Sequence, residues 1–226
     1  MANNAVALLL IGGSGLRYGS VPPKQFQNFE GKPLFLHAAE TISSCFEKIV
    51  YVCHPDYLRF AKHIVEDAKR LRKEDVFIEG GESRQDSTLR GLLYLEKEGL
   101  DANAVVIVND GNRPFVTKEM LDECYQKADR CGAAVTAYRS TDSVLISREG
   151  LCADFYENRD EVYIVQTPQA FRFSLLLESA KKAKENGESF TDEGSMVIAI
   201  SGKYPAIVEG SIGNIKITTK EQGDFL

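Results

Sequence analysis

A glycine-rich loop with two cations behind it lies near the start of the chain. The apolar run Ala5–Ile11 leads directly into Gly12-Gly13-Ser14-Gly15, and the cations are Arg17 and Lys24. Glycines allow backbone N–H groups to approach a phosphate chain, because they carry no Cβ and adopt left-handed backbone freely. Lys24 follows Pro22-Pro23, and a cation held rigidly there suits the β- and γ-phosphates of a nucleoside triphosphate. The alternative is that Lys24 is a solvated loop lysine.

This loop matches neither of the two common phosphate-binding fingerprints. The pattern Gly13-x-Gly15-x-x-Tyr18 lacks the third glycine of a dinucleotide-binding loop, and no acidic residue ends a second strand about twenty residues further on. The pattern GxxxxGK[ST] is absent, so the loop is not a P-loop. A glycine loop with nearby cations remains, which indicates phosphate binding without naming the ligand.

Other polar segments stand where strands are predicted to end or helices to begin. Asp110 directly follows the apolar run Ala104–Asn109, and ligands of open α/β sheets bind beyond the carboxyl ends of such strands. An aspartate there commonly binds a metal or a substrate hydroxyl. The segments Gly80–Ser87 and Thr191–Glu193 could bind ligand or could be ordinary helix N-caps. In Gly210–Thr219, alternation predicts a strand on which Lys216 points away from the apolar face.

Strand-length apolar runs alternate along the chain with helical patterns. This alternation predicts an α/β fold of three layers, with a mostly parallel sheet covered on both faces. Residues 1–226 contain no long linker, so a single domain is expected. The predicted strands are Ala5–Ile11, Ile49–Cys53, Val76–Ile78, Ala104–Asn109, Ala133–Tyr138, Tyr163–Gln166 and Tyr204–Glu209. The predicted helices are Pro33–Cys45, Tyr57–Arg72, Arg84–Glu98, Lys118–Arg130 and Phe173–Asn186.

The alternation breaks at about residues 139–166, where the chain is polar and rich in turns. In an α/β domain such a stretch is an insertion, and we expect a hairpin or arm that reaches away from the sheet. Long irregular excursions usually serve function or form an interface. A solvated surface loop is the alternative.

Composition and charge exclude several classes of protein. Lys and Arg number 27 against 33 Asp and Glu, so the net charge of −6 argues against a general nucleic-acid or anionic-membrane binder. No apolar stretch approaches 18 residues and no signal peptide is evident, so a cytoplasmic protein without a membrane span is expected. The five scattered cysteines suit free thiols in a reducing compartment, and the three histidines show no metal-ligand spacing.

Taken in order, the polar segments resemble those of one enzyme family. The motifs GGSGxR, PKQF, GGxSRxxS, xDGxRPF, QTPQAF, TDE and NIKITT follow one another from Leu8 to Thr219. They resemble the 2-C-methyl-erythritol 4-phosphate cytidylyltransferases and their relatives, the ribitol-5-phosphate cytidylyltransferases. The resemblance implies a Rossmann-like nucleotidyltransferase sheet with a protruding β-arm that swaps between the subunits of a homodimer.

The resemblance also implies a reaction and a set of roles. A phosphate oxygen of a sugar-alcohol phosphate attacks the α-phosphorus of CTP and expels pyrophosphate. The ion, Mg²⁺ or Mn²⁺, is held mainly by the CTP phosphates, with Asp110 as the one candidate protein ligand. The implied catalytic residues are Arg17, Lys24 and Lys216, and the implied nucleotide-binding residues are Gly12, Gly13, Ser14, Gly15, Gly81, Glu82 and Ser87, with Arg84 fixing their loop. The implied acceptor-binding residues are Asp110, Arg113, Ser143 and Thr191 for the hydroxyls, and Arg159 and Thr167, on the partner's arm, for the phosphate.

The departures from the family pattern lie on the acceptor side. Members usually have HDxxRP and D-T where this chain has Asn109, Asn112 and Asp142-Ser143. Asn112 replaces a small apolar residue with an amide that could bind a hydroxyl. The acceptor therefore stays open between methylerythritol phosphate, for isoprenoid precursors, and ribitol phosphate, for cell-wall or capsule polymers. A catalytically dead nucleotide-binding paralogue is disfavoured because the cations are retained.

Overall fold

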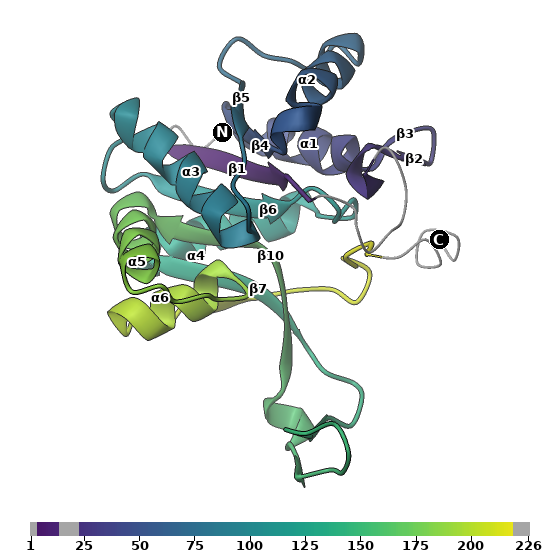
Figure 1. The fold of residues 1–226 in the computed structure, drawn as a ribbon, viewed down its shortest axis with the longest axis vertical. Coiled ribbons are helices and arrows are strands. Elements are labelled where there is room, and N and C mark those ends of the chain that lie inside the picture. The colour runs from purple at the N-terminus through teal and green to yellow at the C-terminus, as the bar shows by residue number, and fades with distance from the viewer. Residues whose placement is uncertain (1–3, 14–22, 219–226) are drawn as a thin grey trace.

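The computed structural model describes residues 4–13 and 23–218 as an α/β fold around a seven-stranded sheet (Figure 1). The strand order is β11-β7-β10-β6-β1-β4-β5, and every neighbouring pair is parallel except the two that involve β10. The mostly parallel sheet expected from the sequence is confirmed. The strands are β1 (Ala5–Ile11), β4 (Ile49–Cys53), β5 (Val76–Glu79), β6 (Val105–Asp110), β7 (Ala133–Arg139), β10 (Tyr163–Arg172) and β11 (Ala206–Glu209).

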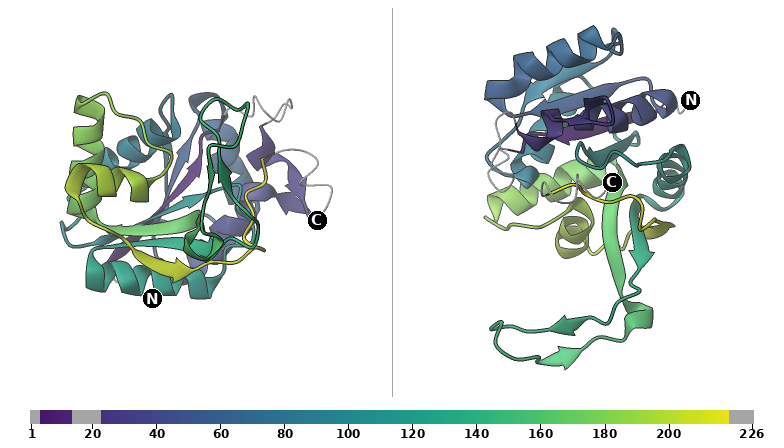
Figure 2. Two further views of the ribbon diagram at one scale, coloured as in Figure 1. Left: turned by 90° about the horizontal axis from the view of Figure 1, so that it is seen from below. Right: turned by 90° about the vertical axis from the view of Figure 1, so that its right-hand side faces the viewer.

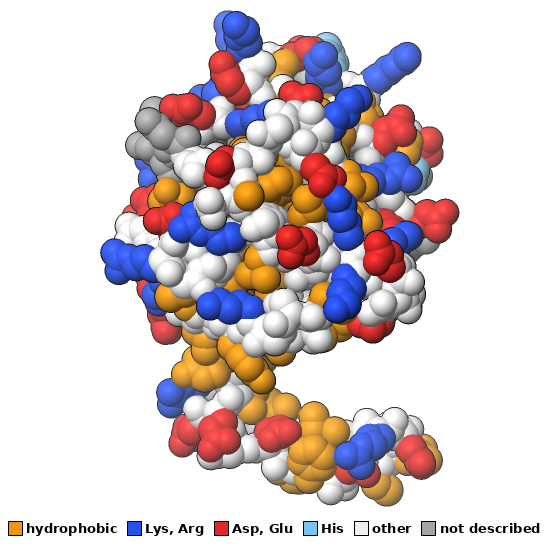
Figure 3. All heavy atoms as spheres, turned by 90° about the vertical axis from the view of Figure 1, so that its left-hand side faces the viewer, with side chains coloured by type: hydrophobic (Ala, Val, Ile, Leu, Met, Phe, Trp, Pro, Cys, Tyr) orange, Lys and Arg blue, Asp and Glu red, His pale blue; other side chains and the backbone are white. Residues whose placement is uncertain are grey.

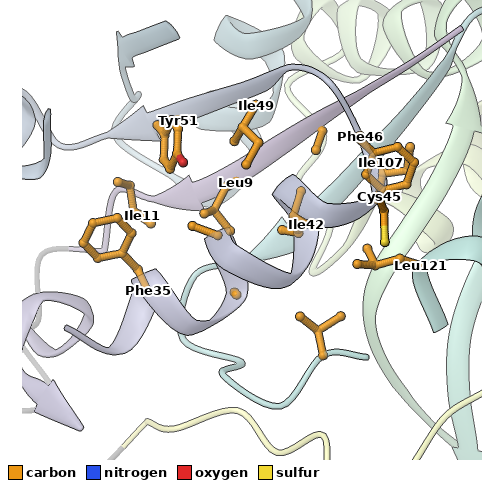
Figure 4. Close-up of a cluster of buried hydrophobic side chains, with 14 of the residues drawn as sticks. Leu9, Ile11, Phe35, Ile42, Cys45, Phe46, Ile49, Tyr51, Ile107 and Leu121 are labelled. Carbon is orange, nitrogen blue, oxygen red and sulfur yellow. The ribbon is translucent and has the colours of Figure 1, made fainter. Parts of the chain in front are cut away.

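Helices cover both faces of the sheet, because side chains alternate along each central strand. On β1, Leu9 and Ile11 pack beneath α1, as Figure 4 shows, whereas Leu8 belongs to the cluster on the opposite face. Helices α1, α2 and α4 cover the first face, and α3, α5 and α6 the second. The helices are α1 (Leu34–Cys45), α2 (Leu58–Asp67), α3 (Arg84–Lys97), α4 (Lys118–Cys131), α5 (Phe173–Glu185) and α6 (Glu193–Ser201).

An arm leaves the sheet between β7 and β10 and extends well beyond the body (Figures 1 and 2). Strand β7 leads out and β10 returns beside it, so β10 is antiparallel to its neighbours. The arm carries the small strands β8 (Leu145–Ile146) and β9 (Phe155–Tyr156) and a short 3₁₀ turn, Arg159–Glu161. An arm at this position is what the irregular composition of residues 139–166 predicted.

Apolar side chains are exposed along this arm (Figure 3). Leu151 is 83% exposed and Tyr156 is 68% exposed, although side chains of this kind are normally buried. The others are Leu145, Phe155, Ile164 and Val165. Together they form an apolar patch on the arm, which suits burial against another surface.

Some predicted elements differ from the structure. The strand expected at Gly210–Thr219 is wrong as far as residue 218, because residues 210–218 belong to no strand and include a turn at 212–213. The strand predicted at Tyr163–Gln166 continues to Arg172. Helix α6 was expected only as a capped start at Thr191–Glu193, and α2 ends at Asp67 instead of Arg72.

The remaining short elements connect these parts. A small hairpin, β2 (Asn28–Phe29) and β3 (Lys32–Pro33), precedes α1, and 3₁₀ turns occur at Lys24–Phe26 and Pro55–Tyr57. Across residues 4–13 and 23–218, no helix combines the length and apolar character needed to cross a bilayer.

Candidate active site

A cavity of about 520 Å³ opens at the carboxyl ends of β1, β4, β5 and β6. This is the edge at which open α/β sheets bind their ligands. Residues from four loops and from the C-terminal segment come together there. The lining residues are Leu10, Ile11, Gly12, Gly13, Lys24, Gln25, His54, Gly81, Glu82, Ser83, Arg84, Ser87, Asp110, Asn112, Lys216 and Thr218.

The end of β1 is held by the buried side chain of Gln25. Its amide Nε2 donates to the carbonyl oxygens of Ile11 and Gly13, both at 2.8 Å. Lys24 precedes Gln25 in the 3₁₀ turn, so this contact also fixes the lysine beside the glycine loop. The predicted site residues Ser14, Gly15 and Arg17 lie outside the described residues.

The loop after β5 is closed by the hydroxyl of Ser87. This Oγ accepts from the N–H of Gly81 at 3.0 Å and donates to the carbonyl of Ser83 at 2.9 Å. Ser83 also caps α3, because its Oγ accepts from Asp86 N. The same residue therefore begins the helix and, through its carbonyl, holds the Ser87 hydroxyl that closes the loop. At Gly81, a Cβ would lie 2.4 Å from the Cβ of Asp86, so only glycine fits.

Asp110 ends β6 among three cationic side chains. Its Oδ1 accepts from Arg84 Nε at 3.0 Å, its Oδ2 lies 2.8 Å from Lys216 Nζ, and Arg113 Nε is 4.0 Å away. Burial by itself would raise the pKa of Asp110, but Arg84, Lys216 and Arg113 hold it well below its usual range. The carboxylate is therefore ionised at any ordinary pH and orients the lysine.

Arg84 is itself held by a second, almost fully buried carboxylate. Glu193 is 2% exposed, and its Oε1 accepts from Arg84 Nη1 at 2.7 Å and from Thr88 Oγ1 at 2.8 Å. Burial alone would lower the pKa of Arg84, but the two carboxylates raise it above its usual value. Arg84 thus ties α3 to β6 and α6, rather than fixing only the loop before α3.

Of the remaining predicted acceptor residues, two are buried and three are exposed. Thr167 is not on the arm but in the body part of β10, where its Oγ1 accepts from Asp110 N at 3.1 Å. Arg113 is 8% exposed and donates through Nη1 to the carbonyl of Asn214, outside the cavity lining. Ser143 and Arg159 are exposed on the arm, and Thr191 is exposed ahead of α6, so one chain does not bring these three into the cavity.

Three polar side chains support the site through hydrogen bonds that were not predicted from the sequence. Gln25 stood within the PKQF motif, and its amide is the support of the glycine loop. Glu193 stood within TDE and anchors Arg84. Asn112, expected to bind a hydroxyl, instead donates through Nδ2 to the carbonyl of Ile217 at 2.9 Å.

The described residues do not form a protein cage for a metal ion. No three His, Cys, Asp or Glu side chains come together among them in a suitable group. Both carboxylate oxygens of Asp110 contact cations, so Asp110 could bind a metal only by giving up such a contact. Among the described residues, the carboxylate of Asp110 is thus committed to cationic side chains.

Comparison with known proteins places this geometry in a family. The family model for IspD, 2-C-methyl-D-erythritol 4-phosphate cytidylyltransferase, matches residues 5–225. The chain belongs to this family. Membership confirms the resemblance recognised in the motifs and the prediction that the chain is a cytidylyltransferase.

Relatives and solved structures of the IspD family agree in length and fold. A 2-C-methyl-D-erythritol 4-phosphate cytidylyltransferase of Thermosipho africanus is 37% identical over 217 residues, or 96% of this chain and 93% of the relative. One from Clostridium botulinum strain Langeland is 33% identical over 223 residues, or 98% and 94%. The crystal structure of 4-diphosphocytidyl-2C-methyl-D-erythritol synthase from Anaerococcus prevotii gives a TM-score of 0.83 at 29% identity, covering 98% of this chain and 93% of that one.

Proposed function

We propose that this chain transfers the cytidylyl group of CTP to 2-C-methyl-D-erythritol 4-phosphate and releases pyrophosphate. The observation that carries the proposal is that Gly12 and Gly13 after β1, Lys24, the Gly81 loop, Asp110 and Lys216 line one cavity. The family model and the relatives that match nearly the whole chain are named for this activity.

The chemistry needs positioned charge rather than a general base. A phosphate monoester has a second pKa of about 6, so its attacking oxygen is already largely ionised at neutral pH. The acceptor oxygen would attack the α-phosphorus, a new P–O bond would form, and the bond to pyrophosphate would break. The site must then align the two reactants and neutralise the charge that builds up on the phosphates.

Lys216 suits the α-phosphate because of how its ammonium is held. An ammonium has three N–H donors, and the contact with Asp110 uses only part of this capacity. Its remaining donors are available to the α-phosphate and the incoming phosphate. Lys24, which also lines the cavity, would contact the β- and γ-phosphates. Mg²⁺ or Mn²⁺ would enter as part of the nucleotide substrate.

The exposed apolar arm supports a homodimer with shared active sites. Arg159 lies on the arm and is exposed, with Nη1 directed to the carbonyl of Thr141 at 3.5 Å. A twofold dimer would bury the apolar patch and bring Arg159 of one chain to the acceptor phosphate in the other. The five free cysteines, three of them buried, suit a reducing compartment such as the cytoplasm.

The proposal is tested by the rate of pyrophosphate release with CTP and each candidate acceptor. We expect Mg²⁺-dependent turnover with 2-C-methyl-D-erythritol 4-phosphate and much slower turnover with D-ribitol 5-phosphate. The matched control omits the acceptor, because hydrolysis of CTP would also release pyrophosphate. Faster turnover with ribitol phosphate, or equal rates in excess EDTA, would contradict the proposal.

A further inference from the structure

Lys216 lies in a part of the chain that belongs to no strand or helix. Residues 210–218 belong to no strand or helix, and beyond Gly210, whose N–H still donates to the carbonyl of Ala137 in β7, they do not continue the seven-stranded sheet. A cation that must meet a phosphate within a fraction of an ångström needs a fixed backbone on both sides. Lys216 must therefore be held in place by contacts other than those of a helix or strand.

One residue, Asn112, replaces the missing strand partner. Its main-chain carbonyl accepts from Ile217 N at 2.9 Å, and its side-chain Nδ2 donates to Ile217 O, also at 2.9 Å. Both backbone groups of the residue after Lys216 are thus bound to one asparagine. Asn112 is 8% exposed and the side chain of Ile217 is 2% exposed, so this clamp lies in the interior.

The loop that carries Asn112 also holds the other end of the lysine. Asp110, two residues earlier, contacts Lys216 Nζ at 2.8 Å, and Arg113 donates to the carbonyl of Asn214 at 2.7 Å. Residues 110–113, at the end of β6 and just after it, therefore contact the ammonium, the following backbone and the preceding turn. Gln166 of β10 also holds that turn, through the carbonyls of Ser211 and Asn214.

We propose that Asn112 is a positioning residue that sets the location of the Lys216 ammonium through the backbone of Ile217. The inference rests on the proposed function, in which Lys216 stabilises charge on the reacting phosphates. Asn112 acts through Ile217 and does not recognise the acceptor itself. Its loss therefore affects the transition state more than the binding of either substrate.

The test is the Asn112→Ala variant, compared with wild type and with Ile212→Ala, an exposed residue of the same segment. We expect kcat to fall by about 10- to 100-fold, as for a displaced catalytic group, with KM for both substrates within about twofold. In a Lys216→Ala background the same substitution should change kcat little, because the group that Asn112 positions is then gone. Ile212→Ala should behave as wild type.

Hydrogen–deuterium exchange gives a second, activity-independent measurement. The peptide that contains Ile217 should exchange faster in Asn112→Ala. The main-chain carbonyl of residue 112 still accepts from the Ile217 amide, but the side-chain bond to the Ile217 carbonyl that holds this segment against it is lost. Peptides from β1 should be unchanged. An unchanged kcat, unchanged exchange or an equal loss in the Lys216→Ala background would overturn the inference. A raised acceptor KM at normal kcat would instead make Asn112 a hydroxyl ligand, and also overturn it. Wild-type protein that forms no product would refute the proposed function, and this inference with it.

Discussion

Replacing Arg84 with alanine tests the network that supports the site. Arg84 joins two carboxylates whose side chains are nearly inaccessible, Asp110 at 8% and Glu193 at 2%. Removing one partner of a buried ion pair typically costs about 3–5 kcal/mol, because the remaining charge stays buried without compensation. Since Arg84 is itself 26% exposed, we expect the lower end, about 3 kcal/mol. For a chain of this size that lowers Tm by about 6–12 °C.

The pH dependence of this loss follows from the pKa of Asp110. The wild-type protein holds this pKa well below the value of about 3.9 for an unfolded aspartate, so the ion pairs stabilise the fold above about pH 4. That stability is lost as the pH falls through the folded pKa. In Arg84→Ala the pKa of Asp110 rises toward or above its ordinary value. The stability difference between wild type and variant should therefore narrow below about pH 5.

The assay is urea unfolding of both proteins at pH 7 and at several acidic values. The control is Arg90→Ala, which removes an exposed arginine from the same helix, α3. We expect the control to change the unfolding free energy by less than about 0.5 kcal/mol. One contradicting result is that Arg84→Ala loses no more unfolding free energy than the control, and another is that its stability difference from wild type stays constant across the pH range. Either result would show that the ion pairs of Arg84 do not stabilise the fold as described.

Three further predictions concern activity. Lys24→Ala and Lys216→Ala should each lower kcat by about 10²- to 10³-fold, as for loss of one contact to developing charge, with a much smaller change in urea midpoint. Near-normal kcat in steady-state assays would rule out the assigned role. Gly81→Ala should raise the KM for CTP, because its Cβ would meet Asp86 at 2.4 Å and displace the loop; an unchanged KM would contradict this. Mixing inactive Arg159→Ala and Lys24→Ala chains should restore activity through one intact hybrid site, whereas mixing Lys24→Ala with Lys216→Ala should not. No recovery in the first mixture after subunit exchange would count against a shared site.

Strands, strand ends and helix N-caps could be predicted where each depends on a pattern within a short stretch of the sequence. The run Ala5–Ile11 is strand β1 to the residue, because a strand buried on both faces is apolar throughout. Asp110 was placed at the end of a central strand by the same reasoning. The N-caps at Ser83 and Asp192 were likewise visible as short polar residues before helices.

The contacts that give the site its electrostatics are not local. Arg84 meets Glu193 across 109 positions of sequence, and no pattern of spacing connects them. The strand predicted around Lys216 failed for a related reason. The backbone groups of Ile217 find their hydrogen-bond partner in Asn112 and not in a neighbouring strand.

Direct transfer of the cytidylyl group to the acceptor phosphate is tested by ³¹P NMR. The reaction is run with CTP and with 2-C-methyl-D-erythritol 4-phosphate labelled with ¹⁸O in its phosphate. We expect pyrophosphate and a diphosphate diester in equal amounts, with the ¹⁸O retained in the new P–O–P bridge. This follows because the acceptor oxygen attacks the α-phosphorus of CTP directly. CMP as the main nucleotide product, or a bridge without label, would contradict it.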